Sequence, residues 1–243
     1  MDERTEQKLT AELPDTARVL DVGGGAYPFR RADYVLDGLS YDERGALCLG
    51  ARPGERFTRD SWVQWDLCDR RPWPFADKFF DFAVCSHVLE DVRDPVWVCA
   101  ELCRVAKAGY IETPSRALEQ SLGVEHPLYA GYYHHRWLVS HDKNGLILRH
   151  KPHSLHALRG AIVAKVGVLR AINPAHAAMS FTWRDTFSCR EARSFDEAEV
   201  NRELCETARE WRPRPDLTIS RGGSLRSILR RALYYFRLRV SRP

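Results

Sequence analysis

The segment Ala17-Arg18-Val19-Leu20-Asp21-Val22-Gly23-Gly24-Gly25 decides the expected fold. Its first six residues predict a buried strand, which runs directly into three glycines. A glycine turn at the carboxyl end of a buried strand lets a ligand approach the backbone closely, as in phosphate-binding and nucleotide-binding loops. In isolation, the three glycines are equally compatible with a plain tight turn. Asp21 and the glycines are therefore the first candidate ligand-binding residues.

Downstream of this turn, short apolar stretches alternate with turn residues and with one amphipathic segment. A helix is expected to begin with Asp94 as its N-cap and Pro95 at its first position. It should continue to about Lys107 and end at Gly109. Pro28 limits the segment between the first two strands to a turn or two of helix. Further strands are expected at residues 34–37, 62–65, 82–86 and 110–113.

This alternation predicts an α/β fold with a Rossmann-like, doubly wound and mainly parallel sheet and a shortened first helix. After Pro114 the pattern loosens into an elaborated C-terminal region. Asn144-Gly145 predicts a hairpin whose strands we place at 137–140 and 146–148. A helix near 154–169 and a strand near 180–188 are also expected.

Composition restricts the class of protein. The 243 residues are 44% hydrophobic, which is enough for one large core. The first eight residues lack the apolar run of a secretory signal, and no uncharged apolar stretch reaches about 18 residues, so a soluble, cytoplasmic protein is expected. The seven cysteines are scattered without a CxxC pair, which fits a reducing compartment, and no metal site is expected.

The arginines are concentrated at the C-terminal end. The net charge of +4 includes seven arginines from residue 221 onward, so the rest of the chain is slightly acidic and no nucleic acid is expected as a partner. Apolar residues at helical spacing predict a basic amphipathic helix over 221–243. It could pack on the domain with solvated arginines, dock peripherally on the anionic inner membrane surface, or contact an acidic partner or glycan.

Two more carboxylates follow predicted strands. Asp37 stands sixteen residues after Asp21 at the end of the second strand, where an acid is suited to accept hydrogen bonds from both ribose hydroxyls. Asp66 follows the third strand and is placed to accept from an exocyclic adenine amine. The loop GGGAYPF lacks the pyrophosphate cradle that opens a full helix in dinucleotide-binding proteins. A nucleoside-type cofactor without phosphates therefore fits better.

Five motifs follow one another between residues 17 and 115. They are Val19-Leu20-Asp21-Val22-Gly23-Gly24-Gly25, Trp65-Asp66-Leu67, Pro74-Phe75-Ala76-Asp77 with Phe80-Asp81-Phe82, Ser86-His87-Val88-Leu89-Glu90, and Glu101-Leu102-Cys103-Arg104-Val105. In this order and at this spacing they resemble the class I S-adenosylmethionine-dependent methyltransferases, in particular the small-molecule type. The resemblance covers less than half of the chain.

The resemblance implies S-adenosyl-L-methionine as the cofactor. The residues implied to contact it are Asp21, Gly23, Gly24 and Gly25 at the methionine part, Asp37 at the ribose, Asp66 and Leu67 at the adenine, and Ser86 beside His87 on the methyl-donor side. Two positions depart from the family pattern. Ala26-Tyr27-Pro28 stands where a further glycine and a full helix are common, and Asp91 stands where a histidine usually follows Leu-Glu.

Methyl transfer from a sulfonium is an in-line displacement, so the protein supplies alignment and, for a hydroxyl acceptor, a base. The candidate acceptor-side residues are the bases His87, His134 and His135, the anion clamp Arg136, and the aromatic contacts Tyr27 and Trp137. For His87 and for the pair His134-His135, a purely structural role is an open alternative to a role in the reaction. His87 could cap the helix after the fourth strand, and the histidine pair could form a surface loop that packs on Trp137.

The chain is expected to comprise an N-terminal segment with a short helix (1–16), a single methyltransferase domain and the basic helix (221–243). The domain consists of a cofactor-binding half (17–115) and an acceptor-side region that completes it (116–220). The expected function is methyl transfer to a small-molecule or glycan- or lipid-linked acceptor, at oxygen. One alternative is a cofactor-binding but catalytically silent regulatory or partner module. Another is an enzyme that uses a nicotinamide cofactor, which the missing G-x-G-x-x-G disfavours. The oligomeric state is left open.

Overall fold

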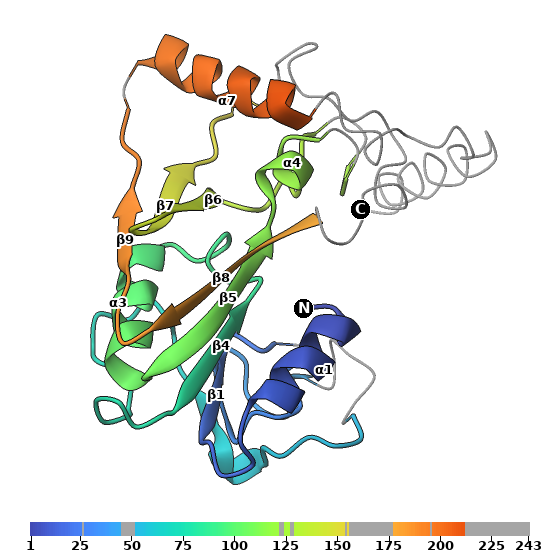
Figure 1. The fold of residues 1–243 in the computed structure, drawn as a ribbon, viewed down its shortest axis with the longest axis vertical. Helices are drawn as coiled ribbons and strands as arrows, with labels where there is room; N and C mark the ends of the chain where they lie inside the picture. The colour runs from blue at the N-terminus through green and yellow to red at the C-terminus, as the bar shows by residue number, and fades with distance from the viewer. Residues whose placement is uncertain are drawn as a thin grey trace, which may run out of the picture.

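The computed structural model describes residues 1–25, 27–44, 52–121, 124–126, 129–153, 155, 177–194 and 196–211 (Figure 1). Its elements in chain order are α1 (Glu3–Glu12), β1 (Val19–Val22), β2 (Tyr34–Asp37), the 3-10 helix η1 (Arg59–Ser61), β3 (Trp62–Gln64), β4 (Phe82–Ser86), α3 (Pro95–Val105), β5 (Ala108–Pro114), α4 (Arg116–Glu119), β6 (Trp137–Asp142), β7 (Gly145–His150), β8 (Ala178–Arg184), β9 (Ser188–Glu191) and α7 (Glu197–Trp211).

The central sheet has six strands in the order β3-β2-β1-β4-β5-β8. The first five run parallel, and β8 pairs antiparallel with β5 along the whole of both strands. The predicted Rossmann-like, mainly parallel sheet is therefore confirmed. Because β8 comes from the second half of the chain, the region after residue 115 supplies a strand to the same sheet that the first half begins.

The two faces of this sheet are covered by different helices (Figure 1). On one face, the fully buried Val98, Leu102 and Val105 of α3 join a core that includes Leu20 and Val22 of β1. On the other face, Leu9 of α1 packs in a cluster with Val19 and Val35. Since successive strand residues point to opposite faces, even and odd positions of β1 serve two separate cores.

Helix α3 begins as predicted and ends earlier. The Asp94 side chain accepts from the Trp97 amide at 3.1 Å, and Pro95 occupies the first turn. The helix stops at Val105, and Gly109 lies inside β5, so the prediction that Gly109 ends the helix is wrong. A Cβ at Gly109 would lie 2.5 Å from the Ala83 carbonyl oxygen and 2.8 Å from the Trp183 ring. Because Gly109 has no side chain, the Ala83 carbonyl of β4 and the Trp183 ring of β8 can pack directly against β5.

Between β1 and β2 the described residues form turns, and the shortened first helix that was expected is not among them. The Tyr27 amide donates to the Gly24 carbonyl at 3.0 Å, and the Phe29 amide donates to the Asp21 carboxylate at 2.7 Å. Pro28 has no amide hydrogen to give to a helix. The described residues after this hydrogen bond continue through turns into β2.

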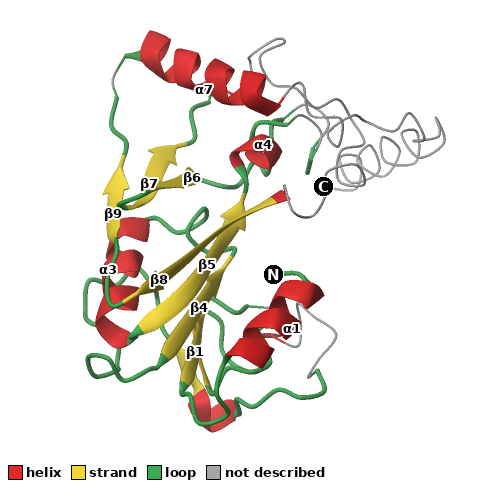
Figure 2. Cartoon of the chain, viewed as in Figure 1, coloured by secondary structure: helices red, strands yellow, loops and turns green. Residues whose placement is uncertain are grey.

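The second sheet has the order β6-β7-β9, and Figure 2 shows its strands apart from the central sheet. The predicted hairpin is confirmed, with Asp142 paired to Gly145 at its turn. The strand predicted near 180–188 is divided by Asp185, whose φ is 60°, into β8 and β9, which join different sheets. Helix α7 packs Leu204 against Leu138 of β6.

Two predicted helices, at 154–169 and 221–243, lie outside the described residues except for Leu155. The predicted helix in the N-terminal segment is present as α1, with Asp2 as its N-cap. Within the part of the chain that the structure describes, no helix is both long enough and apolar enough to cross a membrane.

Candidate functional site

Four polar side chains lie at the carboxyl edge of the central sheet, on the face that α1 covers. Val19, Val35, Val84 and Tyr110 pack on the α1 side, and the residues two positions further along their strands are Asp21, Asp37, Ser86 and Glu112. Because side chains two residues apart share a face, these four project on the same side of four adjacent strands. Parallel strands end at one edge, so the four define a common rim, here named the cofactor rim.

The glycine turn closes onto this rim. Gly23 has a φ of 69°, and a Cβ there would lie 2.4 Å from Cγ2 of Val88 in the loop after β4. Gly25 has a φ of 50°, and its amide donates to Oδ2 of Asp37 at 2.8 Å. Positive φ is easily adopted only by glycine, so the turn needs glycine at both positions. The turn therefore connects the ends of β1, β2 and β4.

The two carboxylates on the first strands are poorly solvated. Burial, opposed by the Phe29 amide and reinforced by the nearby Asp37, raises the pKa of Asp21 to about 7. Burial also raises the pKa of Asp37, against hydrogen bonds from the amides of Leu39 and Gly25. Charged carboxylates held with so little water favour a bound cation or hydroxyl donors.

Asp66 and Leu67 follow β3 at the same edge, where the Trp65 amide donates to the Asp37 carbonyl at 2.7 Å. The Asp66 carboxylate accepts from the Cys68 amide at 2.9 Å and from Arg93 at 2.7 Å. These two donors lower the pKa of Asp66. The Leu67 side chain belongs to the core on the α3 face. The structure thus brings Asp21, Asp37 and the glycines together, while Asp66 stands beside them with an arginine partner.

His87 is held between two buried carboxylates. It has a φ of 57°, and its Nδ1 and Nε2 each lie 3.3 Å from a carboxylate oxygen, of Glu90 and of Glu112 respectively. Burial by itself would lower the pKa of His87, but hydrogen bonds to Glu112 and Glu90 outweigh it and raise the pKa to about 9. At neutral pH the ring is a cation, a form that donates protons and does not accept them.

Glu112 was not foreseen, although it stands alone as an acid in the apolar strand Tyr110-Ile111-Glu112-Thr113. Tyr110 donates to it at 2.6 Å and Ser86 at 3.3 Å. Burial would raise the pKa of Glu112, but hydrogen bonds from His87 and Tyr110 prevail and lower it to about 2. Glu112 is therefore the carboxylate that holds Ser86 and His87 in place at the end of β4.

The histidine pair before β6 lies against the loop that carries His87. The amides of Arg136 and Trp137 donate to the Glu90 carbonyl at 2.7 and 3.0 Å. His134 is half-exposed and His135 is buried. The Arg136 side chain is exposed. The hydrogen bonds to Glu90 bring the predicted acceptor-side residues next to the end of β4.

Trp137 and Tyr27 have different surroundings. The indole of Trp137 donates to the Val92 carbonyl at 2.9 Å and lines a cavity of about 530 Å³ that also includes Trp97. The arginines that line the same cavity are Arg70, Arg93, Arg190 and Arg193. Tyr27 is 63% exposed beside the glycine turn. Asp94 and Glu191 also line this cavity, and each of the four arginines is paired with an acid, so the lining is polar and aromatic.

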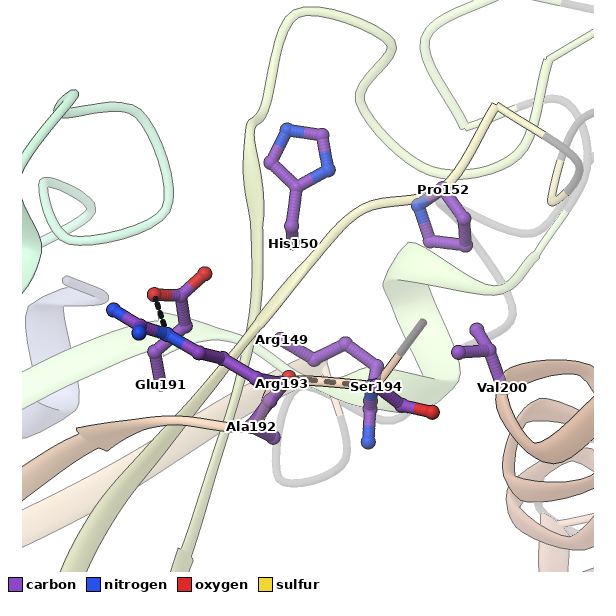
Figure 3. A pocket seen from close by; sticks show the side chains of 8 residues that line it. All are labelled: Arg149, His150, Pro152, Glu191, Ala192, Arg193, Ser194 and Val200. Atoms are coloured by element: carbon purple, nitrogen blue, oxygen red, sulfur yellow. Dashed lines mark hydrogen bonds and ion pairs between the residues drawn. The ribbon is translucent and has the colours of Figure 1, made fainter. Parts of the chain in front are cut away.

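A second cavity, of about 420 Å³, lies between β7, the segment after β9 and α7 (Figure 3). Arg149 and Arg193 reach into it, and Arg193 pairs with Glu191 at 3.0 Å. None of the residues predicted to bind cofactor or acceptor lines it.

Comparison with known proteins shows a similarity over part of the chain. Residues 39–111 match the family model described as a methyltransferase domain. The comparison with curated proteins finds no match. Among solved structures, the YcgJ protein from Bacillus subtilis is similar at 19% identity and a TM-score of 0.37, over 47% of this chain and 52% of that chain.

Two further structures are titled as S-adenosylmethionine-dependent methyltransferases. The one from Aquifex aeolicus has 20% identity and a TM-score of 0.34, over 46% of this chain and 64% of that chain. The one from Mesorhizobium loti has 20% identity and a TM-score of 0.35, over 60% and 63%. The alignments therefore span less than two thirds of the length of each of these proteins.

Proposed function

We propose that the chain is a methyltransferase of the class I S-adenosylmethionine-dependent type, which binds this cofactor at the cofactor rim and methylates an oxygen of a small-molecule or glycan- or lipid-linked acceptor. The match of residues 39–111 to the methyltransferase-domain model supports this proposal. The observation that carries the proposal is the convergence of Asp21, Asp37 and the glycine turn at one edge of the sheet, with Gly25 bonded to Asp37.

The residues of the rim fit the chemical groups of this cofactor. The buried Asp21 carboxylate would pair with the cofactor's ammonium, which would supply the cation that its surroundings lack. Asp37 would accept from the ribose hydroxyls, and Asp66 from the adenine amine. When bound, the cofactor supplies an electrophilic methyl group on a sulfonium.

The chain's own contribution to the reaction is alignment. Ser86 and His87 are fixed by Glu112, and they would line the methyl-donor side without needing to move. Since His87 is cationic at neutral pH, it would position groups and would not remove the acceptor proton. Of the other two predicted bases, His135 is buried and His134 is half-exposed beside this loop, so His134 would take that proton.

The cavity lined by Trp137 supports the proposal that the methyl acceptor is a polar or anionic molecule with a ring. The cavity lined by Trp137 and Trp97 combines aromatic faces with four arginines. Aromatic faces bind sugar rings, and arginines bind phosphate or carboxylate groups.

The proposal is tested with methyl-labelled S-adenosylmethionine and a panel of acceptors that includes sugar phosphates and lipid-linked glycans. Label transfer to an acceptor oxygen is the expected result. Cofactor binding without transfer to any acceptor would instead support the catalytically silent module. Absence of binding altogether would contradict both.

A further inference from the structure

A second polar cluster lies beside the cofactor rim and consists of Asp91, His134 and His135. One potential ligand atom from each lies within 4.8 Å of the others. The Nε2 atom of His134 lies 4.0 Å from Oδ2 of Asp91, and that of His135 lies 3.9 Å from Oδ1. Asp91 follows β4, and the histidines precede β6. Two imidazole nitrogens and a carboxylate from separate parts of the chain therefore face one small volume.

Each imidazole is oriented by a carboxylate on its other ring nitrogen. Nδ1 of His134 lies 3.0 Å from Oε2 of Glu125, and Nδ1 of His135 lies 2.6 Å from Oε1 of Glu119. A carboxylate at Nδ1 holds the proton there and leaves the lone pair of Nε2 available to a metal. Both Nε2 atoms point toward Asp91, as they would around a shared ion.

The cluster is anchored on one side and open on the other. Glu119 is almost fully buried and is fixed by Lys151, whose Nζ lies 2.5 Å from Oε2 and also donates to the Tyr132 carbonyl. This network holds His135, which is 7% exposed. Asp91 and His134 are 43% and 48% exposed. One ligand is therefore preorganised, while the solvent side leaves an entry path and room for further ligands.

We propose that Asp91, His134 and His135 bind a divalent transition-metal ion of the Zn²⁺ class. Metal–ligand distances of about 2.1 Å in a tetrahedral site separate the ligand atoms by about 3.4 Å. The two separations between a histidine and Asp91 would need to shorten by about 0.5 Å, and the separation between the two imidazole nitrogens by up to about 1.4 Å. Rotation of the half-exposed Asp91 and His134 side chains would supply these shifts. Mg²⁺ prefers an octahedral shell of oxygen atoms, so it should bind poorly to two imidazoles and one carboxylate.

An ion at this cluster would also change the chemistry of the proposed reaction. The cluster adjoins the loop with His87, because Arg136 and Trp137 donate to the carbonyl of Glu90, the neighbour of Asp91. A metal ion lowers the pKa of an oxygen that it binds, so an acceptor hydroxyl bound there would lose its proton to solvent without His134 as the base. This second step rests on the proposed methyl transfer; metal binding does not.

Metal binding is tested on the untagged full chain after chelator treatment, by isothermal titration with Zn²⁺ and by the visible absorption of Co²⁺. We expect one ion per chain with micromolar or tighter affinity, and no comparable binding of Mg²⁺. Asp91→Asn and His134→Gln should each weaken Zn²⁺ binding at least about tenfold. Glu125→Gln, which alters the partner of one ligand, should weaken it by about tenfold. His141→Gln changes an exposed histidine on β6 outside the cluster and should have no effect.

Two results would overturn this inference. One is the absence of Zn²⁺ and Co²⁺ binding at micromolar concentrations. The other is binding that Asp91→Asn and His134→Gln leave unchanged. Titration of the same variants with S-adenosylhomocysteine separates the two proposals, because cofactor binding at the rim does not require this cluster. If the chain binds S-adenosylhomocysteine but no metal ion, the result contradicts the proposed metal site and leaves the proposed cofactor site standing.

Discussion

The amide of Gly25 donates a 2.8 Å hydrogen bond to the carboxylate of Asp37. This bond joins the turn after β1 to the end of β2, so the backbone that approaches a ligand and the acid that would hold its ribose are fixed relative to each other. A cofactor bound at Asp37, as proposed, would lie next to the glycine turn as well.

The first prediction concerns the need for glycine at position 23. Gly23→Ala should destabilise the fold by about 1–3 kcal/mol, because an alanine would adopt a positive φ and its Cβ would overlap Val88. Gly38→Ala is the matched control, since nothing lies within 4 Å of a Cβ there. It should change the free energy of unfolding by less than about 0.5 kcal/mol. Urea unfolding of the two variants measures the difference, and equal stabilities would contradict the described turn.

The second prediction concerns the pH dependence of stability. The pKa of His87 is raised to about 9 in the folded chain from an ordinary value of 6.5. Its contribution is therefore fully present below about pH 6.5 and is lost as the pH rises through about 9. His87→Gln should flatten the free energy of unfolding between pH 6.5 and 9. If the free energy of unfolding of the wild-type chain does not change between pH 6.5 and 9, and that of His87→Gln does not change either, the His87 ring is not held between carboxylates.

The third prediction concerns the pH dependence of cofactor binding. The pKa of Asp21 is raised to about 7, so the acid is partly protonated near neutral pH. A bound ammonium would lower this pKa, so S-adenosylhomocysteine binding should release protons near pH 7 and weaken as the pH falls below it. Calorimetry in buffers of different ionisation enthalpy measures the released protons. Asp21→Asn should abolish that release, and release that persists in this variant would assign it to another group.

Much of the sheet was predictable from local pattern. Strands β2 and β4 were located to the residue, because each is a short apolar run between turn residues. The pair Asp94-Pro95 located the start of α3, because an N-cap acid followed by a proline is a local signal for the first turn of a helix. These features depend on neighbours in sequence, so the sequence contains the information.

The errors arose where distant contacts decide the structure. Gly109 has the pattern of a helix stop, but it is a strand residue because Ala83 and Trp183 leave no room for a Cβ. The described residues after β1 form turns where a helix was expected, and the Asp21 carboxylate holds this segment through the Phe29 amide. The role of Glu112 follows from its contact with His87, a pairing that no local spacing indicates.

The site was predictable only in part. The structure brings Asp21, Asp37 and the glycines together, as expected, because each lies in or just after the last residues of a strand and parallel strands end at one edge. The cluster of Asp91 with His134 and His135 joins residues more than forty positions apart, and its ligands depend on Glu119 and Glu125, which no motif marks. Such a site is visible only after folding.

The most direct test of the proposed cofactor rim is calorimetric titration of the full chain with S-adenosylhomocysteine, comparing Asp37→Asn with Asp60→Asn. Asp60 is an exposed acid in η1, away from the rim. We predict one binding site per chain, an affinity loss of about 10-fold to 150-fold for Asp37→Asn from the lost charge-assisted hydrogen bonds, and no change for Asp60→Asn. Absence of binding to the wild-type chain, or equal affinity of the two variants, would contradict the account.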